Sequence, residues 1–296
     1  MGYIVKNPYT TDGNWYVGQL HFHTNNSDGG VAPSAMEAAY NTAGYHYVVT
    51  TDHRTATYCA ADDGCTPDPG LTSTLWISGA EIFSTQGDLA LLGISGRTNT
   101  AAPWATRAAS AEVADCITSG GIAMIVHPRQ AIQGYWNWYT ETLPLSDYSL
   151  IEFINGFDYA SDPTTTATGF QQPIDLADEF KQYWWTTTDD AHGTSTGNGF
   201  NQFCTMTQTD NAVISQNDII GSLDAGNFYM RQTSTGPAIT GITDTSSSIT
   251  VSMPSGSYTV NWYKKGRRLA STSSSVVSAS TYTLAGTEGW VQAPGT

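Results

Sequence analysis

The stretch Trp15-Tyr-Val-Gly-Gln-Leu-His-Phe-His-Thr24 combines the two features that decide the fold. Its first part, up to Phe22, is rich in aromatic and aliphatic residues and predicts a β-strand. His21 and His23 lie two residues apart at the end of that strand, where the period-two pleat points both imidazoles to the same side. Two imidazoles on one face of a strand end can share one metal ion.

Further apolar runs of strand character follow along the chain, and helical segments separate several of them. The predicted helices are Pro33–Thr42, Ala101–Thr118 and Ile174–Gln182, and Gly44 and Gly120 follow the first two as stops. Strands that alternate with helices predict a parallel sheet, and seven such units predict a closed or nearly closed α/β barrel. The predicted strands are Trp15–Phe22, Tyr45–Thr51, Leu75–Ala80, Leu89–Ile94, Ile122–Val126, Leu150–Ile154 and Tyr183–Thr188.

The character of the sequence changes after a last predicted helix, Asn217–Asp224. Short alternating strands with Ser, Thr and Gly turns follow, which is typical of a small all-β unit. We therefore expect a barrel domain over residues 1–235 and a β-sandwich-like appendage over residues 236–296. The strands predicted in this appendage are Ala238–Ile242, Ser248–Ser252, Tyr258–Tyr263 and Tyr282–Leu284.

The composition limits the partners that the chain can have. Its 296 residues carry a formal net charge of −15, and only 12% of them are charged, about half of the roughly 25% usual for soluble proteins. The negative field repels nucleic-acid phosphates and anionic lipid headgroups, so we expect neither nucleic acid nor a membrane as partner. No signal peptide or membrane-spanning run is seen, which predicts a soluble chain. Low charge and high Ser and Thr content also fit an extracellular or virion-associated protein, as a homo-oligomer or in a larger assembly.

The four cysteines are of two kinds. Cys59 and Cys65 bracket a short polar loop and can close a disulfide or remain free thiols. Cys116 and Cys204 lie in apolar surroundings that suit buried thiols.

Five of the six histidines lie at or next to the end of a predicted strand, beside a carboxylate or another histidine. Barrel enzymes build their active sites where strand ends meet the loops, so these side chains are expected to converge. Nitrogen and oxygen ligands of this kind suit Zn, Mn or Fe. The candidate ligands are His21, His23, Asp28, His53, Glu81, His127, Asp190 and His192.

The order of these motifs resembles that of the PHP (polymerase and histidinol phosphatase) superfamily of metallohydrolases. The motifs are His21-x-His-Thr with Ser27-Asp-Gly, Thr51-Asp-His, Glu81, His127-Pro and Asp190-x-His. The resemblance spans residues 21–192 and implies a distorted (β/α)7 TIM-like barrel that holds two or three divalent metal ions. It implies His21, His23, Glu81 and Asp190 around a first ion, Glu81 and His127 at a second, and Asp28, His53 and His192 at a third.

One position departs from the pattern of the superfamily. The second ion usually has a further His, Cys or carboxylate ligand, for which the candidates here are Asn155, which we include among the ligands, and Glu152. The motif Glu152-x-x-Asn-Gly, together with Trp15-Tyr-x-Gly and with Asn227-Phe-Tyr ahead of Ser234-Thr-Gly-Pro, resembles the CehA/McbA-like branch.

The resemblance implies a phosphoesterase that hydrolyses a phosphomonoester or small phosphodiester through a metal-bridging hydroxide, with Asp190 accepting or shuttling the proton. Arg129 follows His127-Pro and can bind the phosphate of a small phosphorylated substrate, or instead pair with a nearby acid. A second interpretation is hydrolysis of a carboxylic or carbamate ester at the same site, and a neutral ester would not need Arg129. A third is a structural subunit of an extracellular or virion assembly that carries this barrel.

Overall fold

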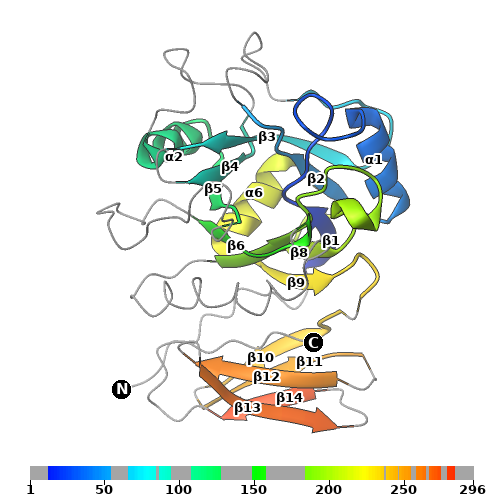
Figure 1. The fold of residues 1–296 in the computed structure, drawn as a ribbon. Helices are drawn as coiled ribbons and strands as arrows, with labels where there is room; N and C mark the ends of the chain where they lie inside the picture. Colours follow the sequence, from blue (N-terminus) through cyan, green and yellow to red (C-terminus); the bar gives the residue numbers. More distant parts are fainter. Residues whose placement is uncertain are drawn as a thin grey trace.

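The computed structural model describes residues 13–54, 66–84, 87–94, 108–127, 149–157, 184–236, 238–245, 247–254, 258–264, 267–274 and 279–283. Within them, nine strands form one large curled sheet in the order β7-β6-β5-β4-β3-β2-β1-β8-β9 (Figure 1). The strands are β1 (Asn14–Gln19), β2 (Tyr47–Thr50), β3 (Leu75–Phe83), β4 (Asp88–Leu92), β5 (Ile122–Ile125), β6 (Leu150–Asn155), β7 (Trp184–Thr188), β8 (Phe203–Thr209) and β9 (Phe228–Gln232). All seven strands predicted before residue 189 are present, with shifted ends.

The strand directions in this sheet are mixed. β1 with β2, β2 with β3, β5 with β6 and β6 with β7 are parallel pairs. β4 is antiparallel to β3 and β5, and β8 is antiparallel to β1 and β9. The prediction of a parallel sheet of seven strand-helix units is therefore wrong at β4, and β8 and β9 were not predicted. The link from Phe83 to Asp88 is too short for a parallel crossover, which needs a dozen or more residues.

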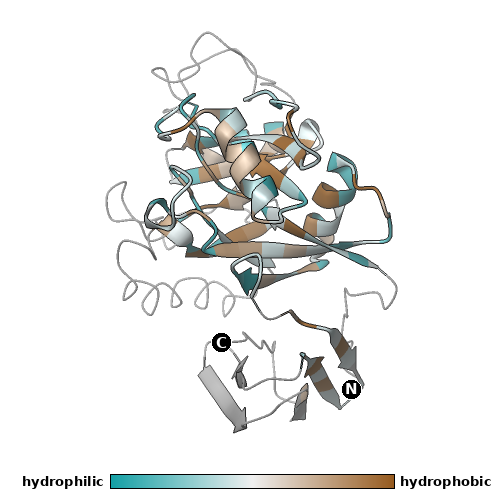
Figure 2. Cartoon of the chain, turned by 90° about the vertical axis from the view of Figure 1, so that its right-hand side faces the viewer, coloured by the Kyte–Doolittle hydropathy of each residue, from teal (hydrophilic) through white to brown (hydrophobic). Residues whose placement is uncertain are grey.

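Different helices cover the two faces of the large sheet. α1 (Pro33–Thr42) and α2 (Ala109–Thr118) pack on one face, and α6 (Gln216–Ala225) packs on the other. The alternation along β4 shows the two faces, because Leu89 and Leu91 pack with α2 whereas Ala90 and Leu92 pack with α6. Figure 2 shows the hydrophobic residues concentrated in the strands and in parts of the helices that flank them. Burial of these apolar side chains on both faces holds the sheet between its helices.

The helix ends follow from local sequence. α1 begins with Pro33 in its first turn, as predicted, and α6 begins at a capping box in which Ser215 and Asp218 bond each other's backbone N–H. Gly226 ends α6 in the left-handed conformation, with φ 77°. The predicted helix Ala101–Thr118 is described from Ala109 onward, and Ile174–Gln182 lies outside the described residues. Among the described helices, none is long and apolar enough to cross a membrane.

The curl of the sheet brings the segments that follow β1 and β7 together. Phe22 and Ala191 form an isolated parallel β-bridge. The His23 N–H donates to the Ala191 carbonyl at 2.8 Å, and the Asp190 N–H donates to the His21 carbonyl at 2.9 Å. Backbone bonds therefore fix the His21-x-His and Asp190-x-His motifs side by side.

Five further strands lie beyond the large sheet in sequence and beneath it in Figure 1. β10 (Gly241–Asp244), β11 (Ser248–Ser252) and β14 (Ala279–Thr283) form one antiparallel sheet, and β12 (Tyr258–Lys264) pairs with β13 (Arg267–Ser274). Within the described residues, none of them pairs with the large sheet. Ile239 still packs against the core that includes Tyr229, so the boundary at residue 235 stays a prediction.

Candidate metal centre

The candidate ligands gather on the face of the large sheet that α6 covers. Glu81 lies on the same side of β3 as Ile77, which packs with α6, because the two are an even number of residues apart. His53 forms an isolated parallel bridge with Glu81, which extends the pairing of β2 and β3 beyond Thr50. Contributions from β3 and from the residues after β1, β2, β5 and β7 thus meet at one edge of the sheet.

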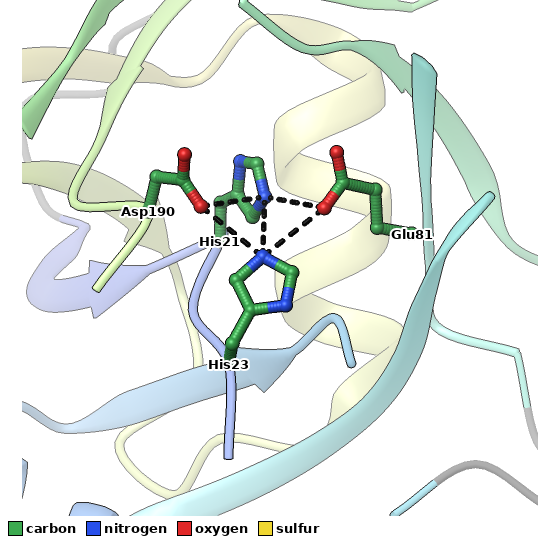
Figure 3. A group of neighbouring side chains, drawn as sticks. All are labelled: His21, His23, Glu81 and Asp190. Carbon is green, nitrogen blue, oxygen red and sulfur yellow. Dashed lines mark hydrogen bonds and ion pairs between the residues drawn. The ribbon is translucent and has the colours of Figure 1, made fainter. Parts of the chain in front are cut away.

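Four buried side chains form what we call the inner group: His21, His23, Glu81 and Asp190 (Figure 3). The Nε2 atom of His21 lies 3.2 Å from His23 Nε2, from Glu81 Oε2 and from Asp190 Oδ1. The Nε2 atom of His23 lies 3.0 Å from Glu81 Oε2 and 3.1 Å from Asp190 Oδ1. One atom of each residue therefore points at a common centre.

This donor set fits a divalent cation. Ligand atoms about 2.1 Å from a tetrahedral ion lie about 3.4 Å from one another, close to the spacing in the inner group. Asp190 Oδ1 is buried and accepts no well-aligned hydrogen bond, although the Nε2 atoms of His21 and His23 lie 3.1–3.2 Å from it and face each other. A buried carboxylate oxygen without a well-aligned partner is costly, and a cation at the centre would satisfy all four atoms.

The electrostatics of the inner group favour added positive charge. Burial lowers the pKa of His21 and of His23, but Asp190 and Glu81 outweigh it and hold both values well above the ordinary one. Burial raises the pKa of Glu81 and of Asp190, but the neighbouring imidazoles outweigh it and hold both below their ordinary values. The group thus attracts protons or a cation in their place.

Glu81 extends between two sets of ligands. Its Oε2 belongs to the inner group, and its Oε1 lies 2.8 Å from His127 Nε2. Beyond His127 lies Asp88, whose Oδ2 is 3.8 Å from His127 Nδ1. Glu81, Asp88 and His127 offer ligand atoms within 4.8 Å of one another. We call these three residues the Asp88 group; Asp88 lies outside the sequence motifs and was not among the predicted ligands.

A third set of ligands surrounds Asp28, and we call Asp28, His53 and His192 the outer group. Asp28 carboxylate oxygens lie 3.4 Å from His192 Nε2, 3.5 Å from His53 Nε2 and 3.4 Å from His23 Nδ1. The backbone carbonyl of Asp190 accepts a hydrogen bond from His192 Nδ1 at 2.9 Å. The proton of the neutral imidazole is then on Nδ1, so the lone pair of Nε2 can bind a cation. Burial raises the pKa of Asp28, but His192 and His53 outweigh it and hold the value far below the ordinary one.

The loop that carries Asp28 depends on a glycine and a buried acid. A Cβ at Gly29 would lie 2.6 Å from the backbone of His23, so no larger residue fits there. Asp52 accepts hydrogen bonds from the Thr24 N–H at 2.6 Å and from Ser27 Oγ at 2.9 Å. Asp52 is thus a support for the loop, although it lies inside the predicted Thr51-Asp-His motif.

Glu152 and Asn155 lie behind the ligands on β6. Glu152 Oε1 lies 3.2 Å from His21 Nδ1 and accepts from Thr188 Oγ1, and its Oε2 accepts from the His127 N–H at 2.5 Å and from Asn155 Nδ2 at 3.1 Å. Asn155 Nδ2 also donates to Asp190 Oδ2 at 3.0 Å. These bonds orient the ligands, and a role of Asn155 as a ligand itself stays a prediction.

The backbone is strained at two of the ligands. Among the described residues, four that are not glycine have positive φ, and His127 (26°) and Asp190 (47°) are two of them. Such conformations cost roughly 1–3 kcal/mol each and persist where surrounding contacts fix them. The bonds of the Glu152 carboxylate to the His127 N–H and of the His21 carbonyl to the Asp190 N–H are such contacts.

Other predicted residues have different outcomes. His46, the histidine outside the sequence motifs, is structural, because its Nδ1 accepts the Val17 N–H at 3.0 Å. Cys116 and Cys204 are buried thiols, as predicted. Arg129, Cys59 and Cys65 lie outside the described residues.

Comparison with known proteins gives structural matches alone. No protein-family model matches the chain, and no curated protein does. One match is a two-domain protein from Bacteroides vulgatus, described as containing a predicted PHP-like metal-dependent phosphoesterase. Its sequence is 13% identical to this chain, and the TM-score is 0.60. The match covers 92% of this chain and 86% of the Bacteroides chain. An amidohydrolase from Chromobacterium violaceum is also 13% identical, with a TM-score of 0.40, over 72% of this chain and 97% of that one. The chain therefore has a fold similar to that of the two-domain Bacteroides protein.

Proposed function

We propose that this chain is a metal-dependent hydrolase of the PHP superfamily that hydrolyses a phosphomonoester or a small phosphodiester. The observation that carries the proposal is the convergence of His21, His23, Glu81 and Asp190, four buried ligand atoms 3.0–3.2 Å apart along the pairs measured. The description of the Bacteroides protein, whose fold is similar, supports the same class of reaction.

Three neighbouring sets of ligands, two of which share the Glu81 carboxylate, favour phosphate chemistry. The inner group, the Asp88 group and the outer group would each hold a divalent ion, of Zn, Mn or Fe. When bound, such ions polarise phosphoryl oxygens and lower the pKa of water. A transferring phosphoryl group spreads its charge over three oxygens, so several neighbouring cations suit it better than they suit a neutral ester.

The residues of this chain would divide the remaining work. Asp190 turns Oδ1 toward the inner group and keeps Oδ2 on Asn155, so Oδ2 is the atom that we assign to accept or shuttle a proton. Phe83 stacks on His53 with ring centroids 5.0 Å apart, and Phe157 lies 4.8 Å from His192. These two rings flank the outer group and would exclude water on that side.

A panel of chromogenic esters tests the reaction class. The protein loaded with Mn²⁺, Zn²⁺ or Fe²⁺ should hydrolyse p-nitrophenyl phosphate or bis(p-nitrophenyl) phosphate with a higher kcat/KM than p-nitrophenyl acetate. A strong preference for the acetate would instead favour the carboxylic or carbamate ester hydrolase of the CehA/McbA-like branch. Hydrolysis of none of them by metal-loaded protein would favour the structural subunit of an extracellular or virion assembly.

Arg129 sharpens the choice between the two esters. Arg129→Ala should lower phosphoester turnover on the order of 10²-fold with metal content unchanged, because charge-assisted bonds to nonbridging oxygens are lost. Arg231→Ala is the matched control, since the Arg231 side chain bonds the Thr233 carbonyl. Phosphoester turnover that stays near the parent value in Arg129→Ala would assign Arg129 a structural role.

A further inference from the structure

We infer that Asp88 is the protein ligand that completes the second cation site with Glu81 and His127, in place of a ligand from β6. The inference rests on the proposed function for the presence of cations, and it assigns a residue that neither the motifs nor the sequence resemblance identified. It also replaces both candidates that the sequence offered for this position, Asn155 and Glu152.

Glu152 has no oxygen left for a cation. Each of its carboxylate oxygens has two partners: Oε1 has His21 Nδ1 and Thr188 Oγ1, and Oε2 has the His127 N–H and Asn155 Nδ2. A carboxylate has about four lone-pair sites, and four partners fill them. Asn155 turns Nδ2 toward two carboxylates, and an amide nitrogen does not ligate a metal.

Asp88 is buried, and within the part of the chain that the structure describes its carboxylate has no hydrogen-bond partner. Only 5% of Asp88 is exposed. Among the described residues, the ion-pair partner of Asp88 is His127, whose Nδ1 lies 3.8 Å away, beyond hydrogen-bond range. A buried carboxylate in this state is unfavourable unless a positive charge approaches it.

The position of Asp88 on β4 also suits a shared cation site with Glu81 and His127. Asp88 lies on the same side of β4 as Ala90 and Leu92, which is the side of the sheet that carries Glu81. Ligand atoms of Glu81, Asp88 and His127 lie within 4.8 Å of one another, and ligands of one ion at about 2.1 Å lie roughly 3–4.3 Å apart. Glu81 Oε1, which the inner group does not use, is the oxygen that faces His127.

Binding of Mn²⁺ alone to the full-length protein tests the inference without any substrate. We compare the parent with Asp88→Asn, with Glu152→Gln and with Glu37→Gln. Glu37 is a buried carboxylate on α1 that bonds Leu71 and Thr72 and thus controls for loss of a buried acid. Calorimetry gives the dissociation constants, and electron paramagnetic resonance shows whether two Mn²⁺ ions share a bridging carboxylate.

The parent should bind at least two exchange-coupled Mn²⁺ ions. Asp88→Asn should weaken one of them by more than about 100-fold, leave the inner-group ion in place and give the six-line spectrum of an isolated Mn²⁺. Glu152→Gln should weaken binding by only about 10–100-fold and keep the coupled spectrum, because Glu152 orients ligands and does not bind the ion. Glu37→Gln should match the parent.

Two results would overturn the inference. Loss of only about 10–100-fold with the coupled spectrum kept in Asp88→Asn would make Asp88 an orienting partner of His127, as Glu152 is for His21. Parent-like binding in Asp88→Asn would leave Asp88 without a role at the site. Failure of the metal-binding premise of the proposed function has a different appearance, because the parent itself would then bind no Mn²⁺, whereas failure of the phosphoesterase reaction alone would leave this binding unchanged. Thermal unfolding of the metal-free variants shows whether each one folds.

Discussion

The inner and outer groups use the same residue types in opposite surroundings. Side chains of the inner group are 0–4% exposed, whereas those of Asp28, His192 and His53 are 36%, 22% and 14% exposed. Water cannot replace a ligand in the inner group, so electrostatic interactions between charges are strong there. The outer group is partly open to solvent, which can compete there for ligand positions. On the proposed function, we expect from this difference a permanent cation in the inner group and an exchangeable one, next to the entering substrate, in the outer group.

His23 lies between the two groups but can serve as a ligand in only one of them at a time. Its Nε2 belongs to the inner group, and its Nδ1 lies 3.4 Å from Asp28. A neutral imidazole has one acceptor nitrogen, so His23 can ligate one cation at a time. The closer contacts of Nε2 assign His23 to the inner group, and the outer group then depends on Asp28, His53 and His192.

The largest expected effect comes from neutralising the inner carboxylate. Asp190→Asn keeps the size of the side chain but removes a charge that the cation needs. We expect kcat for phosphoesters to fall at least on the order of 10³-fold, since a catalytic metal contributes several kcal/mol. Steady-state kinetics and elemental analysis of the same sample check this. An Asp190→Asn protein that keeps its metal and turns over near the parent rate would contradict the greater importance of the inner group over the outer group.

Removal of metal should lower thermal stability, and most of this loss should come from the inner group and not from the outer group. A cation present at 1,000 times its dissociation constant adds about 4 kcal/mol, so chelation should lower Tm by roughly 10 °C. Asp28→Asn should retain most of that shift, because the inner group is intact in it. Scanning calorimetry with and without chelator measures both. Equal chelator shifts in Asp28→Asn and Asp190→Asn would show that the two groups bind with similar strength.

The matched change in the outer group should be milder. Asp28→Asn removes the same charge at a site where solvent can substitute, so we expect kcat/KM to fall about 10–100-fold with the inner metal still bound. Added Mn²⁺ should recover part of the loss, which a titration of activity against metal concentration reveals. A loss as large as that of Asp190→Asn, without recovery, would contradict an exchangeable outer cation.

The smallest expected effect comes from removing the C-terminal strands. A chain that ends at Thr240 keeps Ile239 in the core of the large sheet and loses β10 to β14. Its metal content and kcat should match those of the full chain, because the chain has no histidine after His192. Lost metal in a truncated protein that still folds, as judged by circular dichroism, would show that the site extends into these strands.

Much of this site is predictable from sequence because period-two alternation and strand ends fix where side chains point. The His21-x-His and Asp190-x-His pairs need only the pleat of a strand and the meeting of strand ends. Asp88 escapes this reasoning, because it begins a strand and only C-terminal strand ends were considered. β4 runs antiparallel to β3 and β5, so its first residue lies at the edge where theirs end. The fold departs from the prediction at the same point.

The role of Glu152 in orienting the ligands also could not be predicted from the sequence. Glu152 lies within β6 and appeared as a candidate ligand, and only the three-dimensional contacts show that its oxygens are already taken. β8 was missed for a related reason: four of its seven residues are Thr or Gln, yet all four except Thr209 are buried. Burial of hydroxyl and amide groups depends on partners that are distant in sequence, such as the contact of Thr205 with Thr186.

The most direct test of the account is anomalous X-ray diffraction from crystals of the protein grown with Mn²⁺. The account predicts a strong anomalous peak within ligand distance of His21 Nε2, His23 Nε2, Glu81 Oε2 and Asp190 Oδ1, and a weaker peak beside Asp28 that fades when Mn²⁺ is withdrawn. No peak among the four inner atoms, in crystals soaked at millimolar Mn²⁺, would contradict the central claim that this cluster is a metal centre.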